Sequence, residues 1–203
     1  MAIKPVLSVC IPTYNRCQYL KVCLDSLVHQ PELANGSVEI IISDNCSTDG
    51  TDKLSIYYEN KFKNIHYYKN AENLGAMNNI VLALQRATGV YRKIANDSLC
   101  FKPNALAFLV KYIEKNKIDR PLLFYTNLRI ILPGEEHNPK KMDNVDYGEV
   151  YNLEEFVYNT SYWITWIALY GEWENDQVLN LNKLHGNYKM EMLGHVKYIL
   201  ESF

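Results

Sequence analysis

A polar stretch that directly follows a short apolar run is the feature that most constrains this chain. The apolar run covers residues 38–42, and the polar stretch 43–51 leads into a segment of helical period. In open α/β sheets, ligands bind beyond the carboxyl ends of the strands, where a following helix also presents backbone N–H groups. The stretch therefore predicts either a ligand-binding loop or a turn that caps the next helix through Ser47, Thr48, Asp49 and Thr51.

The same order of apolar strand and polar loop occurs twice more in the N-terminal half. Residues 6–11 precede the loop 12–16, and residues 90–95 precede the polar residues 96–98. Because parallel strands end at one edge of a sheet, the three polar loops are expected to converge there.

Four motifs in this order resemble those of the family 2 glycosyltransferases, inverting enzymes of the GT-A fold. They lie at residues 8–16, 43–49, 72–75 and 87–91. The resemblance covers about residues 6 to 110 of the chain. It implies an α/β protein with a Rossmann-like, mainly parallel central sheet flanked by helices.

Alternating helical and extended patterns favour the same α/β class. Helices are expected at residues 17–29, 54–58, 76–87 and from Pro103, and further strands at residues 64–68 and from residue 121. Beyond about residue 132 the regular alternation gives way to a polar loop. We therefore predict a nucleotide-sugar-binding core at residues 1–131 and an abbreviated acceptor-side region of the same domain at residues 132–203.

Composition excludes several classes of protein. A net charge of −2 argues against nucleic-acid binding. The five cysteines are odd in number and form no C-x-x-C pair, which argues against a disulfide framework or a zinc site. No apolar run has the length of a membrane-spanning helix. We expect a cytoplasmic protein, with any membrane contact peripheral and at the inner face of the plasma membrane.

The resemblance implies a nucleotide-sugar donor, a UDP-sugar in particular, and a glycan or lipid-linked acceptor in surface polysaccharide synthesis. The nucleotide-binding residues that it implies are Pro12, Thr13, Tyr14, Asp44, Asn45 and Asp97. We expect Asp44→Ala to abolish nucleotide binding with little loss of stability, as is usual for a surface residue.

The metal-binding motif of the family departs from its pattern here. The resemblance aligns Asp97 with the first acid of an Asp-x-Asp motif, but Ser98 and Leu99 follow where another acid is expected to hold the metal. Mg²⁺ and Mn²⁺ prefer hard oxygen ligands, often carboxylates, and one serine hydroxyl holds them less tightly. The family's arginine near residues 77–79 is also replaced. Mg²⁺ or Mn²⁺ at Asp97 remains one alternative, metal-independent binding is the other, and no organic cofactor is expected.

Three acids in the C-terminal half are the candidates for the catalytic base. Glu172, Glu174 and Asp176 follow the aromatic run 162–170, which suits a hydroxyl acceptor that stacks on a ring and is deprotonated nearby. The alternative is a solvated helix start with acids in its first turn.

Two other functions compete with sugar transfer. A catalytically weak or inactive nucleotide-binding homologue, acting as a partner subunit, would fit the altered metal motif and the short C-terminal half. A nucleotidyltransferase would require a glycine-rich basic loop after the first strand, which residues 12–16 do not provide.

Overall fold

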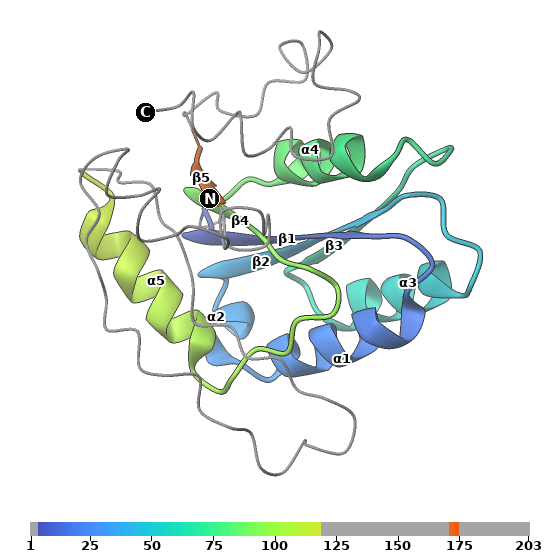
Figure 1. The fold of residues 1–203 in the computed structure, drawn as a ribbon. Coiled ribbons are helices and arrows are strands. Elements are labelled where there is room, and N and C mark those ends of the chain that lie inside the picture. The colour runs from blue at the N-terminus through green and yellow to red at the C-terminus, as the bar shows by residue number, and fades with distance from the viewer. Residues whose placement is uncertain (1–3, 119–170, 175–203) are drawn as a thin grey trace, which may run out of the picture.

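The computed structural model of this protein describes residues 4–118 and 171–174. In these ranges five strands form one sheet in the order β3-β2-β1-β4-β5 (Figure 1). The strands are β1 (Leu7–Thr13), β2 (Val38–Asp44), β3 (Ile65–Lys69), β4 (Tyr91–Ile94) and β5 (Gly171–Trp173). β1 to β4 are mutually parallel, and β5 pairs with β4 in the antiparallel direction. The prediction of a mainly parallel sheet is confirmed.

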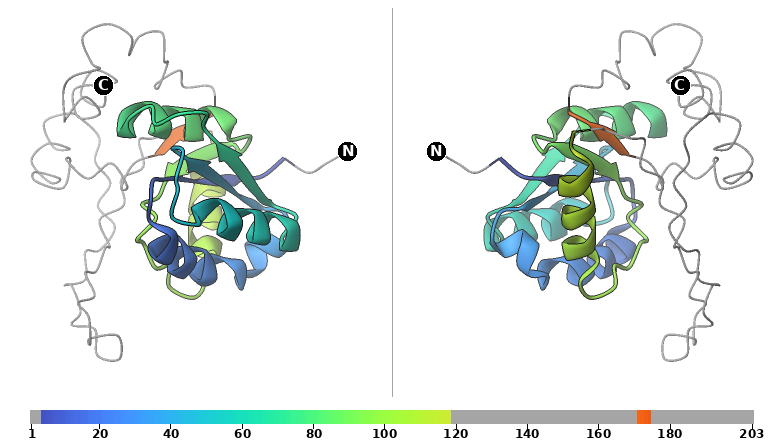
Figure 2. Two further views of the ribbon diagram at one scale, coloured as in Figure 1. Left: turned by 90° about the vertical axis from the view of Figure 1, so that its right-hand side faces the viewer. Right: turned by 90° about the vertical axis from the view of Figure 1, so that its left-hand side faces the viewer.

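Helices cover both faces of this sheet. They are α1 (Cys17–Val28), α2 (Pro31–Ala34), α3 (Thr51–Lys61), α4 (Ala76–Arg86) and α5 (Ala105–Asn116). α4 lies on one face and the other four lie on the opposite face, as the side views show (Figures 1 and 2). Among the described residues, none of the helices combines the length and the apolar character needed to cross a bilayer.

The apolar runs of β1 and β2 form the centre of this three-layer arrangement. Val9 and Ile40 pack on the side of α1 and α5, whereas Cys10 and Ile41 pack on the side of α4. Central parallel strands are buried on both faces and therefore read as continuous apolar runs. This burial explains why Ile40, Ile41 and Ile42 are apolar without alternation.

A buried carboxylate joins three segments at the amino edge of the sheet, where the parallel strands begin. Glu39 accepts hydrogen bonds from Ser8 Oγ (2.6 Å), from the Thr88 backbone N–H (2.6 Å) and from the Gly89 N–H (3.2 Å). A Cβ atom on Gly89 would lie 2.5 Å from Ser8 Oγ, so only glycine fits there. The motif at residues 87–91 therefore has a structural role at the edge away from the candidate site.

The start of α5 differs from the sequence prediction. Pro103 precedes the helix, which begins at Ala105 after Asn104 adopts a left-handed conformation (φ 65°). Gln30, at the end of the turn after α1, caps the helix by accepting a hydrogen bond from the Leu106 N–H (2.9 Å). A cap that comes from such a distant residue leaves no local signal in the sequence.

Candidate functional site

The candidate site lies at the carboxyl edge, where the parallel strands end, on the right in Figure 1. β1 has β2 on one side and β4 on the other, so this position is the switch point of the sheet topology. The ladder between β1 and β4 ends at the pair Cys10 and Ile94, followed by a bond from the Ala95 N–H to the Cys10 carbonyl (2.8 Å). Pro12 has no N–H to extend it. The two strands thus part just before Thr13.

Thr13 and Asp97 meet across this point. Thr13 Oγ1 donates a hydrogen bond to Asp97 Oδ2 (2.9 Å), and Arg16 Nε lies 3.3 Å from Asp97 Oδ1. The Asp97 side chain is 5% exposed, whereas that of Arg16 is 47% exposed. The predicted convergence of the first and third polar loops is therefore present, and it includes a cation that the sequence analysis did not assign.

The protonation of Asp97 reflects its burial. Loss of hydration raises the pKa of its carboxyl group above the ordinary aspartate value, while the hydrogen bond from Thr13 and the charge of Arg16 lower it in part. Arg16 therefore stabilises a carboxylate that burial alone would disfavour.

Asp44 lies at the end of β2, beside Thr13 in the ladder. Its side chain is fully buried: Oδ1 accepts a hydrogen bond from the Ser47 N–H (2.8 Å) and Oδ2 accepts one from Tyr67 OH (2.8 Å). Burial, together with this bond to Asp44, raises the pKa of the Tyr67 hydroxyl, so Tyr67 remains a donor. The expectation that Asp44 behaves as a surface residue is wrong, because its carboxylate organises the loop after β2.

Asn45 is also buried, and its amide group holds the turn before α4. Its Oδ1 accepts a hydrogen bond from the Leu74 N–H (2.9 Å), and its Nδ2 donates to Asn73 Oδ1 (2.7 Å). Gly75 then begins α4 with a positive φ of 80°. The motif at residues 72–75 is thereby tied to the end of β2, and the role of Asn45 toward a nucleotide remains a prediction.

The loop after β2 also supplies a side chain that caps helices. Asp49 Oδ2 accepts a hydrogen bond from the Cys17 N–H (2.9 Å), and its Oδ1 accepts one from the Thr51 N–H (3.1 Å). Cys17 and Thr51 are the first residues of α1 and α3, so one carboxylate caps two helices. Ser47 Oγ accepts a bond from the Asn15 N–H (2.8 Å), which joins the same two loops. The capping alternative is confirmed for Asp49, whereas Ser47 joins two loops and caps none of the described helices.

The carboxylates at this edge do not fit the divalent ion that the family resemblance implies. Both oxygens of Asp44 and both of Asp49 accept hydrogen bonds, and those of Asp97 face Thr13 and Arg16. The exposed Ser98 adds only a neutral hydroxyl. Among residues 4–118 and 171–174, no group of three or more His, Cys, Asp or Glu side chains is placed to hold a metal. The described residues therefore supply no metal-based step.

The remaining nucleotide-binding candidates lie beside these residues. Pro12 is half-buried within β1, and Tyr14 is 44% exposed directly after the strand. An exposed ring at the end of a strand is available to stack on a flat ligand. The assignment of Tyr14 to a nucleotide base therefore stays a prediction that its exposure permits.

The candidate bases lie in or beyond β5. Glu174 donates its backbone N–H to the Val90 carbonyl (2.9 Å), and its side chain forms an ion pair with Lys4. Val90 directly precedes β4, so Glu174 lies at the amino edge, opposite the candidate site. The prediction that Glu174 is the catalytic base is wrong, because Glu174 lies at the edge away from the candidate site. The acidic composition of residues 172–176 does not reveal that β5 runs antiparallel to β4.

The structure describes less of the other two candidate bases, Glu172 and Asp176. The backbone of Glu172 pairs with Arg92 in the ladder between β4 and β5. Asp176 lies outside the described residues, as do the aromatic run 162–170 and the boundary between the two predicted regions at residue 131.

Comparison with known proteins identifies the family. The sequence model described as "Glycosyl transferase family 2" matches residues 8–139, which is well over half of the chain. The chain belongs to glycosyl transferase family 2. The match contains the candidate site, from Thr13 to Asp97.

Curated relatives match about half of the chain. Abequosyltransferase RfbV of Salmonella typhimurium is 38% identical over 110 residues, which are 54% of this chain and 33% of RfbV. The putative teichuronic acid biosynthesis glycosyltransferase TuaG of Bacillus subtilis is 39% identical over 88 residues, 43% of this chain and 34% of TuaG. The chain thus spans about a third of the length of these family 2 relatives.

Solved structures confirm the GT-A fold. S. aureus TarS 1-349 in complex with UDP has a TM-score of 0.50 and 27% identity, and it covers 55% of this chain and 32% of TarS 1-349. The same protein has been solved with UDP-GlcNAc.

Proposed function

We propose that this family 2 glycosyltransferase transfers a sugar from a nucleoside-diphosphate donor, with UDP as the nucleotide, to a glycan or lipid-linked acceptor in surface polysaccharide synthesis. The transfer inverts the anomeric centre, as the family resemblance implies. The protein acts in the cytoplasm, in peripheral contact with the inner face of the plasma membrane.

The observation that carries this proposal is the meeting of Thr13, Arg16 and Asp97 at the switch point of the sheet. Ligands of open α/β sheets bind at this position. A cation held beside a buried acid suits the diphosphate, and the exposed Tyr14 suits the base. The solved TarS complexes with UDP and UDP-GlcNAc support UDP as the nucleotide, and RfbV and TuaG support the polysaccharide pathway.

Binding is tested first with a thermal-shift panel of UDP, GDP, CDP and dTDP on the full chain. A ligand that binds only the folded state stabilises it by an amount that grows with its excess over Kd. We expect the largest shift with UDP. No shift with any of the four nucleotides, at concentrations up to the millimolar range typical of weak binding, would contradict the proposed function.

Transfer is tested by release of UDP from a panel of UDP-sugars, with Asp176→Asn as the test variant and Glu174→Gln as the matched control. Loss of a general base lowers turnover by about 100-fold or more. We propose Asp176 as that base and expect Glu174→Gln to retain turnover, because Glu174 pairs with Lys4 at the opposite edge. Equal losses in both variants would contradict this assignment.

One observation favours a second candidate function, a nucleotide-binding partner subunit without transferase activity. The carboxylates of Asp44, Asp49 and Asp97, at the carboxyl edge, each have both oxygens facing protein donors. Nucleotide binding without sugar transfer or donor hydrolysis across the donor panel would establish this second function.

A further inference from the structure

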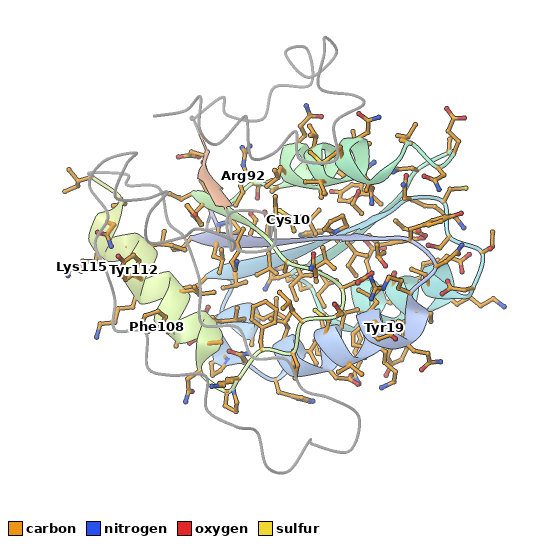
Figure 3. All side chains as sticks on the ribbon, in the orientation of Figure 1. Cys10, Tyr19, Arg92, Phe108, Tyr112 and Lys115 are labelled. Carbon is orange, nitrogen blue, oxygen red and sulfur yellow. The ribbon has the colours of Figure 1, made fainter. Side chains whose placement is uncertain are left out.

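The Arg16 side chain is held by two residues, but part of its guanidinium group stays free in the portion of the chain that the structure describes. Its Nε lies 3.3 Å from Asp97 Oδ1, and its guanidinium carbon lies 4.7 Å from the centre of the Tyr19 ring. Tyr19 itself is exposed, on the end of α1 that lies below the carboxyl edge (Figure 3). The two Nη groups of Arg16 donate no hydrogen bond to residues 4–118 or 171–174, and the side chain is half-exposed. The guanidinium is thus held in position, but its Nη donors have no protein acceptor among the described residues.

The anchors of Arg16 differ from those of the other cations near this edge. Lys69 pairs with Asp52, and both side chains are 37% exposed. Arg86 donates to Ser43 Oγ (2.7 Å) and Asn70 Oδ1 (2.9 Å), so its Nη groups are used within the protein. Among residues 4–118, Arg16 thus differs from Lys69 and Arg86 in that its two Nη groups have no protein partner.

From this geometry we propose that Arg16 binds the diphosphate of the donor and supplies the positive charge that a divalent ion would otherwise provide. The proposal rests on the proposed function, because it concerns the same donor site. Asp97 and Tyr19 are the positioning residues: Asp97 fixes Nε, and the Tyr19 ring supports the face of the guanidinium.

The chemistry of the guanidinium suits this role. Arginine presents parallel N–H donors that match two phosphate oxygens, remains charged at all physiological pH values and is weakly hydrated. A buried carboxylate that holds Nε fixes the guanidinium, and the Nη groups, which have no acceptor within residues 4–118 and 171–174, are available to a ligand. The carboxylates that would coordinate a metal are used for hydrogen bonds and for this ion pair, so charge neutralisation falls to Arg16.

The test compares UDP with uridine, which lacks the diphosphate, by titration calorimetry on the full chain. Arg16→Gln is the test variant. The matched control is Lys21→Gln, which removes a half-exposed cation of α1 that pairs with Asp25. Loss of a charge-assisted bond predicts a Kd for UDP about 10-fold or more weaker in Arg16→Gln, with the Kd for uridine unchanged. Lys21→Gln is expected to bind both ligands as the wild type does.

The role of metal is measured in the same experiment with Mn²⁺ or with EDTA. We expect Mn²⁺ to change the wild-type Kd for UDP by less than Arg16→Gln does, and not to restore the variant. Arg16→Lys keeps the charge but loses the planar fork, so it is expected to fall between the wild type and Arg16→Gln. This second variant also serves if Arg16→Gln does not fold.

The outcomes separate the two proposals. A wild type that binds neither UDP nor uridine overturns the proposed function and this inference with it. A wild type that binds UDP, with variants of Arg16 that bind UDP equally well, overturns only the role of Arg16. Restoration of UDP binding by Mn²⁺ in Arg16→Gln would also overturn it, since a metal would then carry the charge.

Discussion

Glu39 at the amino edge and Asp97 at the carboxyl edge are both buried carboxylates, but they have different partners. At the amino edge, Glu39 accepts hydrogen bonds from Ser8, Thr88 and Gly89, and His66 Nε2 lies 3.8 Å from its carboxylate. At the carboxyl edge, Asp97 takes one hydrogen bond from Thr13 and faces the half-exposed Arg16.

This difference separates acids that hold the fold from acids that serve a site. Backbone and hydroxyl donors that have no other partner make a carboxylate necessary for stability. A cation that reaches solvent makes the carboxylate a support for ligand binding instead. Burial alone therefore does not identify a functional acid. Asp97 differs from Glu39 in that its exposed partner is a permanently charged guanidinium, whereas that of Glu39 is the His66 ring.

The largest expected effect is at the amino edge. Glu39→Ala leaves the Ser8 hydroxyl and the N–H and hydroxyl groups of Thr88 without this acceptor, and it should lower the free energy of unfolding by about 3 kcal/mol. Urea denaturation measures this loss, with Glu39→Gln as a milder variant that retains one acceptor oxygen. A loss no larger than that of an average surface substitution would contradict the conclusion that Glu39 stabilises the fold.

A smaller loss of stability is expected for an acid at the carboxyl edge that has no ligand role. Asp49→Ala removes the cap of α1 at Cys17 and of α3 at Thr51, at about 1 kcal/mol per cap and so about 2 kcal/mol in total. Urea denaturation is again the measurement. The ratio of the Kd values for uridine and UDP should stay at the wild-type value, and a change in that ratio would show that Asp49 contributes to phosphate binding.

Asp97→Asn should affect affinity and stability in opposite directions. The variant loses the charge that anchors Arg16, so the Kd for UDP should weaken by about 10-fold, or about 1.4 kcal/mol. Because burial raises the pKa of Asp97 in the folded state, its contribution to stability is present below the ordinary aspartate pKa and is lost as pH rises through the raised value. Asparagine carries no charge at any pH, so the variant does not lose this stability as pH rises. It should be no less stable than the wild type at neutral pH.

The pH dependence of binding gives the matching measurement. As pH falls through the raised pKa, protonation of Asp97 releases Arg16, so wild-type affinity for UDP should fall relative to that for uridine. Asp97→Asn should show a flatter profile of this ratio, since only the phosphate then titrates. Parallel profiles in the two proteins would contradict the anchoring role of Asp97.

The smallest effect is expected for Lys21→Gln, away from both edges. The ion pair between Lys21 and Asp25 is exposed, and such pairs contribute about 0.5 kcal/mol or less. Asp25 also accepts a hydrogen bond from Tyr58 OH, which remains in the variant. A thermal melt in low salt would detect any larger loss.

Sequence periodicity predicted the regular half well. α1 and α4 lie where apolar spacing placed them, and Thr13 meets Asp97 because parallel strands must end at one edge. These features depend on local pattern and on the topology of α/β sheets, both of which a sequence expresses directly.

The errors share a different cause. The placement of Glu174 depends on the direction of β5, the burial of Asp44 depends on Tyr67 from a neighbouring strand, and the start of α5 depends on Gln30. Arg16 was missed for the same reason, since only its contact with Asp97, 81 positions away by their numbers, marks it. Its one local signal was its place directly after Asn15 in the first motif.

The shared cap at Asp49 has a consequence for motion. One carboxylate holds the first N–H of α1 and of α3, and Asn15 and Ser47 join the same two loops. Opening either loop breaks bonds of the other, so the pair forms one cooperative unit in hydrogen exchange. The amide protons of Cys17 and Thr51 are then expected to have a common protection factor, and this side of the candidate site opens and closes as a single body.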